Sequence, residues 1–169
     1  DGPKFQGQHP RIAYGAGKDS LVAGLSRPAG MRFQKMVDGW VGGNDVYGFE
    51  RWNAALLGQL TGDPKYCTAA VASIDKDVMA AEAAIAAGAA SDVAGDDYLQ
   101  IGPQIGDLAL VYDWCHDAIP GDRQSAWLAY ANQAVTNVWN PDDASWGGTP
   151  MKWSGWAIDD PNDNYYYSF

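Results

Sequence analysis

The sequence predicts an all-α protein built of antiparallel helix hairpins. Apolar residues recur at three- and four-residue steps in five segments, and short turns rich in Gly and Pro separate these segments. No run alternates between apolar and polar residues for long enough to predict a strand. With 169 residues the chain can build one sizeable core, so its length alone favours a single domain.

The N-terminal part divides into an arm and two helices. Residues 1–30 hold nine Gly and Pro residues and are predicted to form an extended arm, after which residues 31–169 form the helical domain. A first helix is predicted over 31–41, where Phe33, Val37 and Trp40 share a face, and a second over 46–61.

Three further helices are predicted between residues 62 and 140. Asp63 occupies an N-cap position and Pro64 the first helical position, and the apolar stripe that follows continues to Gly88. The next two helices, over 104–118 and 122–138, meet at the turn Pro120-Gly121. A last helix is expected near residue 163.

The charge balance excludes some partners. The net charge is −10, and nineteen Asp residues but only two Glu residues supply the acid. Nucleic acid is excluded as a partner because phosphate binding requires a basic surface. No apolar run approaches the roughly 20 residues that span a bilayer, so no membrane partner is expected. Residues 1–51 are locally basic, with seven Lys and Arg against five acids.

The two cysteines, Cys67 and Cys115, fall in separate predicted helices. Their spacing is not that of a zinc site. They are interpreted either as one disulfide between neighbouring helices, which would fit an oxidising compartment, or as two buried free thiols.

Two segments carry a resemblance to a known group of enzymes. "LTGDPKYCTAAV" (60–71) resembles a helix hairpin of α/α-toroid carbohydrate-active enzymes, and "DLALVYDWCHDAIPGDRQSAW" (107–127) resembles a segment of the heparinase II/III-like and alginate-lyase-like polysaccharide lyases. The resemblance implies an incomplete (α/α) toroid. It also implies that the remaining hairpins, and often a β-sandwich domain, lie on the C-terminal part of the same protein or on a complementary chain.

A third segment, "GWAIDDPNDNYYYSF" (155–169), resembles the catalytic element of those lyases, with Asp163 and Tyr165 where the family usually has Asn and His. By resemblance, Asn164 would neutralise a substrate carboxylate and Tyr165 would act as base or acid. The alternative is that Asn164 caps a helix and the tyrosines pack.

Candidate substrate-binding residues fall in two regions. Eight aromatic residues lie within 139–169, and flat rings of this kind stack on sugars, although they also build cores. Arg51 and Lys152 are candidates for a substrate carboxylate. The turn "GGNDVYGFER" could line a cleft, and a helix beginning there would attract anions. The complete set of substrate-binding candidates is Asn44, Tyr47, Arg51, Trp146, Lys152, Trp153, Trp156 and Tyr166.

The remaining chemistry-bearing residues give weaker signals. His116, near a helix C-terminus, is interpreted as structural more than catalytic, and nothing in the sequence orients His9 in the arm. Asp159 and Asp160 could serve as the paired carboxylates of a glycoside hydrolase or as a cap. Together with Asp163 they could also hold Ca²⁺ through oxygen ligands, although the D-x-D-x-D-G spacing of a calcium loop is absent; no cofactor is expected.

The sequence as a whole favours a secreted or periplasmic polysaccharide lyase that cleaves a uronic-acid-containing polymer by β-elimination. Two alternatives stay open: a toroid glycoside hydrolase that uses paired Asp residues, and a non-catalytic carbohydrate-binding or assembly protein. The expected partner in each case is a polysaccharide.

Overall fold

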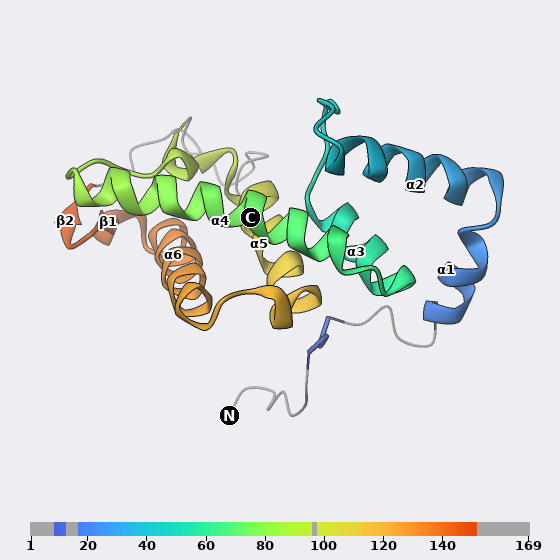
Figure 1. Ribbon diagram of the computed structural model, residues 1–169. Helices are drawn as coiled ribbons and strands as arrows, with labels where there is room; N and C mark the ends of the chain where they lie inside the picture. Colours follow the sequence, from blue (N-terminus) through green and yellow to red (C-terminus); the bar gives the residue numbers. More distant parts are fainter. Residues whose placement is uncertain (1–8, 13–16, 96–97, 152–169) are drawn as a thin grey trace. The chain divides into compact units, whose positions relative to one another are not determined.

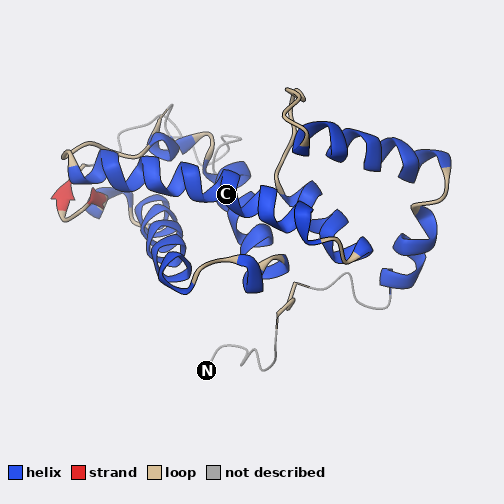
Figure 2. Ribbon diagram, in the orientation of Figure 1, coloured by secondary structure: helices blue, strands red, loops and turns tan. Residues whose placement is uncertain are grey.

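The computed structural model describes residues 9–12, 17–95 and 98–151, and these residues are mostly helical (Figures 1 and 2). This confirms the all-α prediction. The α-helices of the described part are α1 (Lys18–Gly24), α2 (Pro28–Val41), α3 (Trp52–Thr61), α4 (Pro64–Ala86), α5 (Ile101–Trp114) and α6 (Gly121–Trp139). Short 3-10 helices lie between or after these α-helices, at η2 (Asp92–Ala94), η4 (His116–Ala118) and η5 (Pro141–Asp143). The strands β1 (Ser145–Trp146) and β2 (Thr149–Pro150) pair antiparallel.

The described part of the chain divides into two compact units. Unit 1 comprises Asp1–Ile74 and Ala109–Pro120, and unit 2 comprises Asp75–Leu108 and Gly121–Phe169. The divisions fall within α4 and within α5, so each of these helices contributes one half to each unit.

In unit 1, α1 and α2 both pack against α3. Figure 1 shows α1 and α2 in blue, joined by a short turn. Apolar residues three and four positions apart share a helix face, so α3 and the first half of α4 bury small and branched side chains in the core of unit 1. The buried apolar residues of this unit are Val37, Ala54, Ala55, Leu57, Leu60, Tyr66, Ala70, Val71, Ile74, Val111, Cys115 and Ile119.

The start of α4 matches the sequence prediction closely. Asp63 Oδ1 accepts the backbone N–H of Lys65 at 3.0 Å, which is the expected N-cap bond, and Pro64 is the first helical residue. The first turn is tied to α2, since Tyr66 donates its hydroxyl to Asp38 at 2.9 Å and Lys65 Nζ lies 3.2 Å from the same carboxylate.

Two of the predicted elements differ from the structure. The extended arm predicted over residues 1–30 is wrong for α1 and for the first residues of α2, because packing on α3 makes a Gly-rich segment helical. The helix predicted over 46–61 begins only at Trp52, because Gly48 has a φ of +67°, which a helix cannot accommodate.

A cluster of buried residues in unit 2 comprises Val93, Tyr98, Ile101, Ala134, Val138, Ala144 and Trp146. Asn137 of α6 is 1% exposed, and its side chain forms two hydrogen bonds with the backbone of β1. Its Nδ2 donates to Ser145 O at 2.8 Å and its Oδ1 accepts the Ser145 N–H at 3.1 Å. The strands were missed from the sequence because each has two residues, joined by Gly147 and Gly148, both at positive φ.

A charged cluster joins α4 to α6 within unit 2. Arg123 Nε donates to Asp75 at 2.7 Å and its Nη2 to Glu82 at 2.8 Å. Trp127 Nε1 donates to the same Asp75 oxygen at 2.8 Å, while its ring is fully buried. The two carboxylates raise the pKa of the Arg123 guanidinium, although partial burial opposes this shift.

Candidate functional site

A cavity of about 500 Å³ lies within unit 1. The first turn of α4, the end of α3 and the end of α5 with η4 supply most of its wall, and the segment 9–10 closes one side. Its polar and titratable lining residues are His9, Lys18, Gln59, Asp63, Asp113, His116 and Asp117. A volume of this size falls in the range of about 300–1,000 Å³ that ligand sites occupy.

His9 and Asp113 form the central contact of this cavity. Their atoms Nδ1 and Oδ1 are 2.6 Å apart, across a sequence separation of 104 residues. Both side chains are largely withdrawn from solvent, with 14% of His9 and 6% of Asp113 exposed. A carboxylate that holds one nitrogen of an imidazole fixes the orientation of the ring and the position of its proton.

The carboxylate of Asp113 also holds the backbone of the N-terminal segment. It accepts the N–H of Arg11 at 2.8 Å and that of Ile12 at 2.6 Å, both through Oδ2. Burial raises the pKa of Asp113, but the two backbone N–H groups and His9 outweigh this effect, so the net pKa lies below its ordinary value. Asp113 is therefore a fixed negative charge at neutral pH.

A second imidazole lies against the first. The rings of His9 and His116 are stacked with their centroids 4.0 Å apart and their planes 7° from parallel. The ring of Tyr112 meets both of them edge-on, at 5.9 Å from His9 and 5.4 Å from His116. Two imidazole rings, a side-chain type that can accept or donate a proton, thus lie side by side at the cavity.

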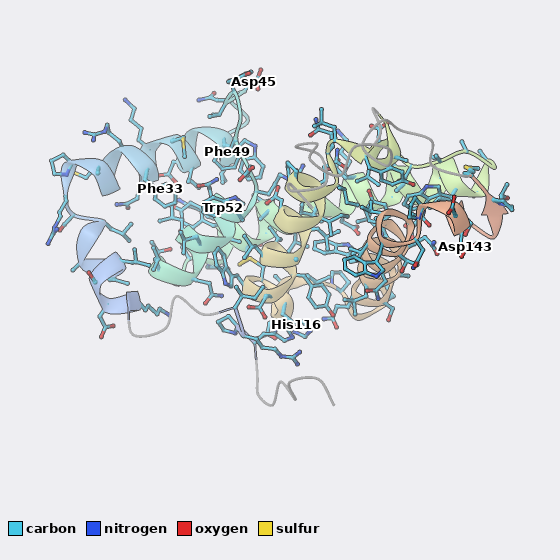
Figure 3. All side chains as sticks on the ribbon, turned by 180° about the vertical axis from the view of Figure 1, so that it is seen from behind. Phe33, Asp45, Phe49, Trp52, His116 and Asp143 are labelled. Atoms are coloured by element: carbon cyan, nitrogen blue, oxygen red, sulfur yellow. A yellow bond between two sulfur atoms is a disulfide. The ribbon has the colours of Figure 1, made fainter. Side chains whose placement is uncertain are left out.

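The end of α5 explains why these groups converge. Asp113 is followed by Trp114, where α5 ends, and the chain turns before η4 begins at His116. Trp114 Nε1 donates to Ile12 O at 2.7 Å, and the Trp114 carbonyl accepts the amide of Gln59. These bonds hold the N-terminal segment on one side of Trp114 and α3 on the other. Figure 3 labels His116 beside that segment.

A disulfide between Cys67 and Cys115 forms part of the wall. The two Cα atoms are 5.3 Å apart, and the bond joins α4 to the residue after α5. Of the two possibilities that the sequence left open, the structure has the paired form. The disulfide fixes the first turn of α4 relative to Asp113 and His116, which lie on either side of Cys115.

The sequence-predicted site residues are placed as follows. Tyr47 is fully exposed on the loop between α2 and α3, and Asn44 lies on the same loop and is also exposed. Arg51 is half-buried directly before α3. None of these three lines the cavity that holds His9.

Trp146, predicted to face a sugar, has 1% of its surface exposed. Its Nε1 donates to Tyr98 at 3.2 Å, and its ring packs in the core of unit 2. The prediction is wrong for the conformation seen here, because a buried ring offers no face to a ligand. Of the remaining candidates, Asn164 and Tyr165 (catalytic) and Lys152, Trp153, Trp156 and Tyr166 (substrate-binding) lie outside the described residues, as do Asp159 and Asp160.

The described residues do not gather three or more His, Cys, Asp or Glu side chains in a way that could hold a metal ion. In the same part of the chain, no helix has the length and apolar character needed to cross a membrane.

Sequence reasoning noted His9 and His116 but did not bring them together. The contact joins the N-terminal arm to the residues that follow α5. A local pattern cannot report such a pairing. The sequence offered one signal, the run Tyr112–Asp117, which places Asp113 and His116 close together at the end of a predicted apolar helix.

Comparison with known proteins yields no relative. No protein-family model, curated protein or solved structure matches this chain.

Proposed function

We propose that this chain carries the acid–base site of a polysaccharide lyase, which cleaves a uronic-acid-containing polymer by β-elimination. The observation that carries the proposal is the His9–Asp113 pair stacked on His116 at a cavity of about 500 Å³. The resemblance of residues 60–71 and 107–127 to toroid lyases points to the same chemistry, and the toroid arrangement of helices is part of the proposal.

The reaction sets the requirements for the site. A base removes the proton on the carbon next to the uronate carboxyl group, the C–O bond to the leaving sugar breaks, and a C=C double bond forms. An acid then gives a proton to the leaving oxygen. A cation beside the carboxyl group stabilises the negative charge that develops on it, and water is not consumed.

His9 is suited to act as the base. When its Nδ1 carries the proton that Asp113 accepts, Nε2 keeps a lone pair that can take the substrate proton. Asp113 would stabilise the imidazolium that results, because it stays negative and lies 2.6 Å away. Asp113 is therefore a positioning residue in this proposal.

His116 and Lys18 are assigned the two other roles. His116 lies parallel to His9 at 4.0 Å, so a proton donor and a proton acceptor can face the same substrate. Lys18 lines the same cavity and supplies a cation for the substrate carboxylate. Asn164 and Tyr165, assigned by resemblance, would add to this set.

The environment in which such an enzyme works is part of the proposal. The Cys67–Cys115 disulfide is supporting evidence for a secreted or periplasmic protein, because disulfides persist in oxidising compartments. The net charge of −10 argues against nucleic acid as a partner.

A glycoside hydrolase is the second candidate, because two carboxylates, Asp63 and Asp117, also line the cavity. Hydrolysis needs one carboxyl group kept protonated by its surroundings. Asp63 is engaged as the cap of α4, and the Asp117 side chain is fully exposed, so this pair suits hydrolysis less well than the histidines suit elimination.

The experiment that tests the proposal separates the three candidate functions. The purified protein is incubated with a panel of uronate polymers and neutral glycans, and the ultraviolet absorbance of the conjugated C=C product is followed together with new reducing ends. A rise in both on a uronate polymer is expected. New reducing ends without the absorbance would establish the hydrolase, and binding without either product would establish a non-catalytic protein.

A further inference from the structure

The exposed face of α2 and the loop after it form a second hollow in unit 1, separate from the histidine cavity. It has a volume of about 350 Å³ and is open to solvent along its length. Its lining residues are Arg32, Lys35, Met36, Gly39, Asn44, Asp45 and Val46. The name α2 groove is used for this set.

Helix geometry and one glycine bring the lining residues together. Positions 32, 35, 36 and 39 share one face of α2, since they are three or four residues apart. Asn44 folds back over this face, where its N–H donates to Gly39 O at 3.0 Å. A Cβ on residue 39 would lie 3.3 Å from Asn44 Nδ2, so the absence of a side chain at Gly39 allows this close approach.

The groove is locally basic on an acidic protein. Arg32 and Lys35 are exposed, and neither forms an ion pair with any described residue. Asp45 is the acidic member of the lining, and it leaves the groove with a net positive charge. Two neighbouring cations on one helix face repel each other, and a bound anion relieves that repulsion.

The loop that closes the groove is anchored and presents an aromatic ring. Trp40 and Phe49 stack with their centroids 4.6 Å apart, which fixes both ends of the loop. Between them, Tyr47 is exposed over its whole side chain. Figure 3 shows Asp45 at the outer end of this loop, with Phe49 nearer to α3, which begins at Trp52.

We infer that the α2 groove binds the carboxylate groups of an acidic polysaccharide, as a holding site distinct from the histidine cavity. The planar guanidinium of Arg32 can pair with a carboxylate through two hydrogen bonds, and Lys35 adds a second positive charge. Asn44 can form hydrogen bonds with sugar hydroxyls, and the ring of Tyr47 can stack on the face of a sugar ring. The class of ligand rests on the proposed function.

The two sites are separate in the structure. They share no lining residue, and Figure 3 places Asp45 and His116 at opposite edges of unit 1. A polymer held at the α2 groove therefore raises the local concentration of substrate without contacting the groups that move protons.

Binding to polygalacturonate, with neutral dextran as the reference glycan, tests the inference. Arg32→Ala combined with Lys35→Ala is expected to weaken polygalacturonate binding at least 10-fold at low salt and to raise KM with kcat unchanged. The matched control is Arg27→Ala with Lys76→Ala, two exposed bases outside the groove, and this control should bind within 2-fold of the wild type. Asp45→Asn should tighten binding, because it removes the acid from the lining.

Three results would overturn the inference: equal loss in the groove variant and its control, equal binding of dextran, or no effect of salt on affinity. Each is independent of the proposed function, because a failure of that function shows as binding without unsaturated product. The His9→Ala variant should bind polygalacturonate as the wild type does. This result would separate polymer binding at the α2 groove from catalysis at the histidine cavity.

Discussion

The two units of this chain use their interacting polar groups in different ways. In unit 2, Asn137 bonds to Ser145, and Arg123 bonds to Asp75 and Glu82, so these groups are used in joining one element to another. In unit 1, Asp113 is hydrogen-bonded to His9, and His9 stacks on His116, but these groups lie on the wall of a cavity.

This difference separates structural from chemical use of polar side chains. A buried hydrogen bond between elements stabilises the fold and specifies one arrangement of the core. A carboxylate that instead orients an imidazole at an open cavity prepares a proton acceptor for a ligand. The contrast predicts that substitutions of the polar groups at the unit 1 cavity alter turnover, whereas substitutions of the polar groups that join elements of unit 2 alter stability.

The largest expected effect is on turnover. His9→Ala should lower kcat about 10²- to 10⁴-fold, because it removes the proposed base, while the unfolding midpoint changes little. Asp113→Asn should lower kcat less and alter the pH profile, because the ring keeps its nitrogen but loses its fixed orientation. Steady-state rates on the cleaved polymer measure both, and equal rates for wild type and His9→Ala would remove His9 from the mechanism.

Loss of the disulfide should give the largest change in stability. Cys67 and Cys115 are 48 residues apart, and closing a loop of that length stabilises the folded state by about 4 kcal/mol through chain entropy. Cys67→Ser with Cys115→Ser should lower the free energy of unfolding by up to that amount in urea titrations. A midpoint that stays the same under oxidising and reducing conditions would show that the pair does not form in solution.

Asn137→Ala tests whether the polar groups that join elements of unit 2 affect stability and leave turnover unchanged. It removes both bonds to Ser145 and should cost about 2 kcal/mol of unfolding free energy, since the backbone groups of Ser145 lose their partner. The rate per folded molecule should not change. A fall in kcat comparable with that of His9→Ala would break the distinction between the units.

The smallest expected effect is on the docking of residues 9–12, which should depend on pH. The folded pKa of Asp113 lies below its ordinary value of 3.8, so the stabilisation is complete above that value and is lost as the pH falls through the lower, folded pKa. The indole N–H resonance of Trp114, which donates to Ile12, reports this transition by NMR. Asp113→Asn should abolish the transition, and a transition that persists in this variant would belong to another group.

The sequence was a good guide wherever the signal is local. The N-cap Asp63 with Pro64 predicted the start of α4, and Pro120-Gly121 marked the start of α6. Short helices and strands that depend on packing were missed, as α1 and the pair β1–β2 show. Tertiary contacts decide such segments, because a seven-residue helix is not stable alone in water.

The candidate site was less accessible from sequence for a related reason. His9 and Asp113 are 104 residues apart, and the sequence around each of them does not predict that the two side chains meet. Trp146 shows the opposite error, since a Trp- and Gly-rich stretch suggested an exposed ring, whereas the glycines form a turn that leaves Trp146 in the core. Composition indicates which residues could bind a sugar, but burial decides which of them are able to.

The rate of unsaturated-product formation by His9→Ala, with and without added imidazole, tests the central claim most directly. Removing the ring leaves space at a cavity of about 500 Å³, where free imidazole can enter and accept the proton beside Asp113. The account predicts that imidazole restores part of the lost rate in a saturable way and does not affect the wild type. If the variant still binds polymer and imidazole leaves its rate unchanged, His9 is not the group that takes the proton.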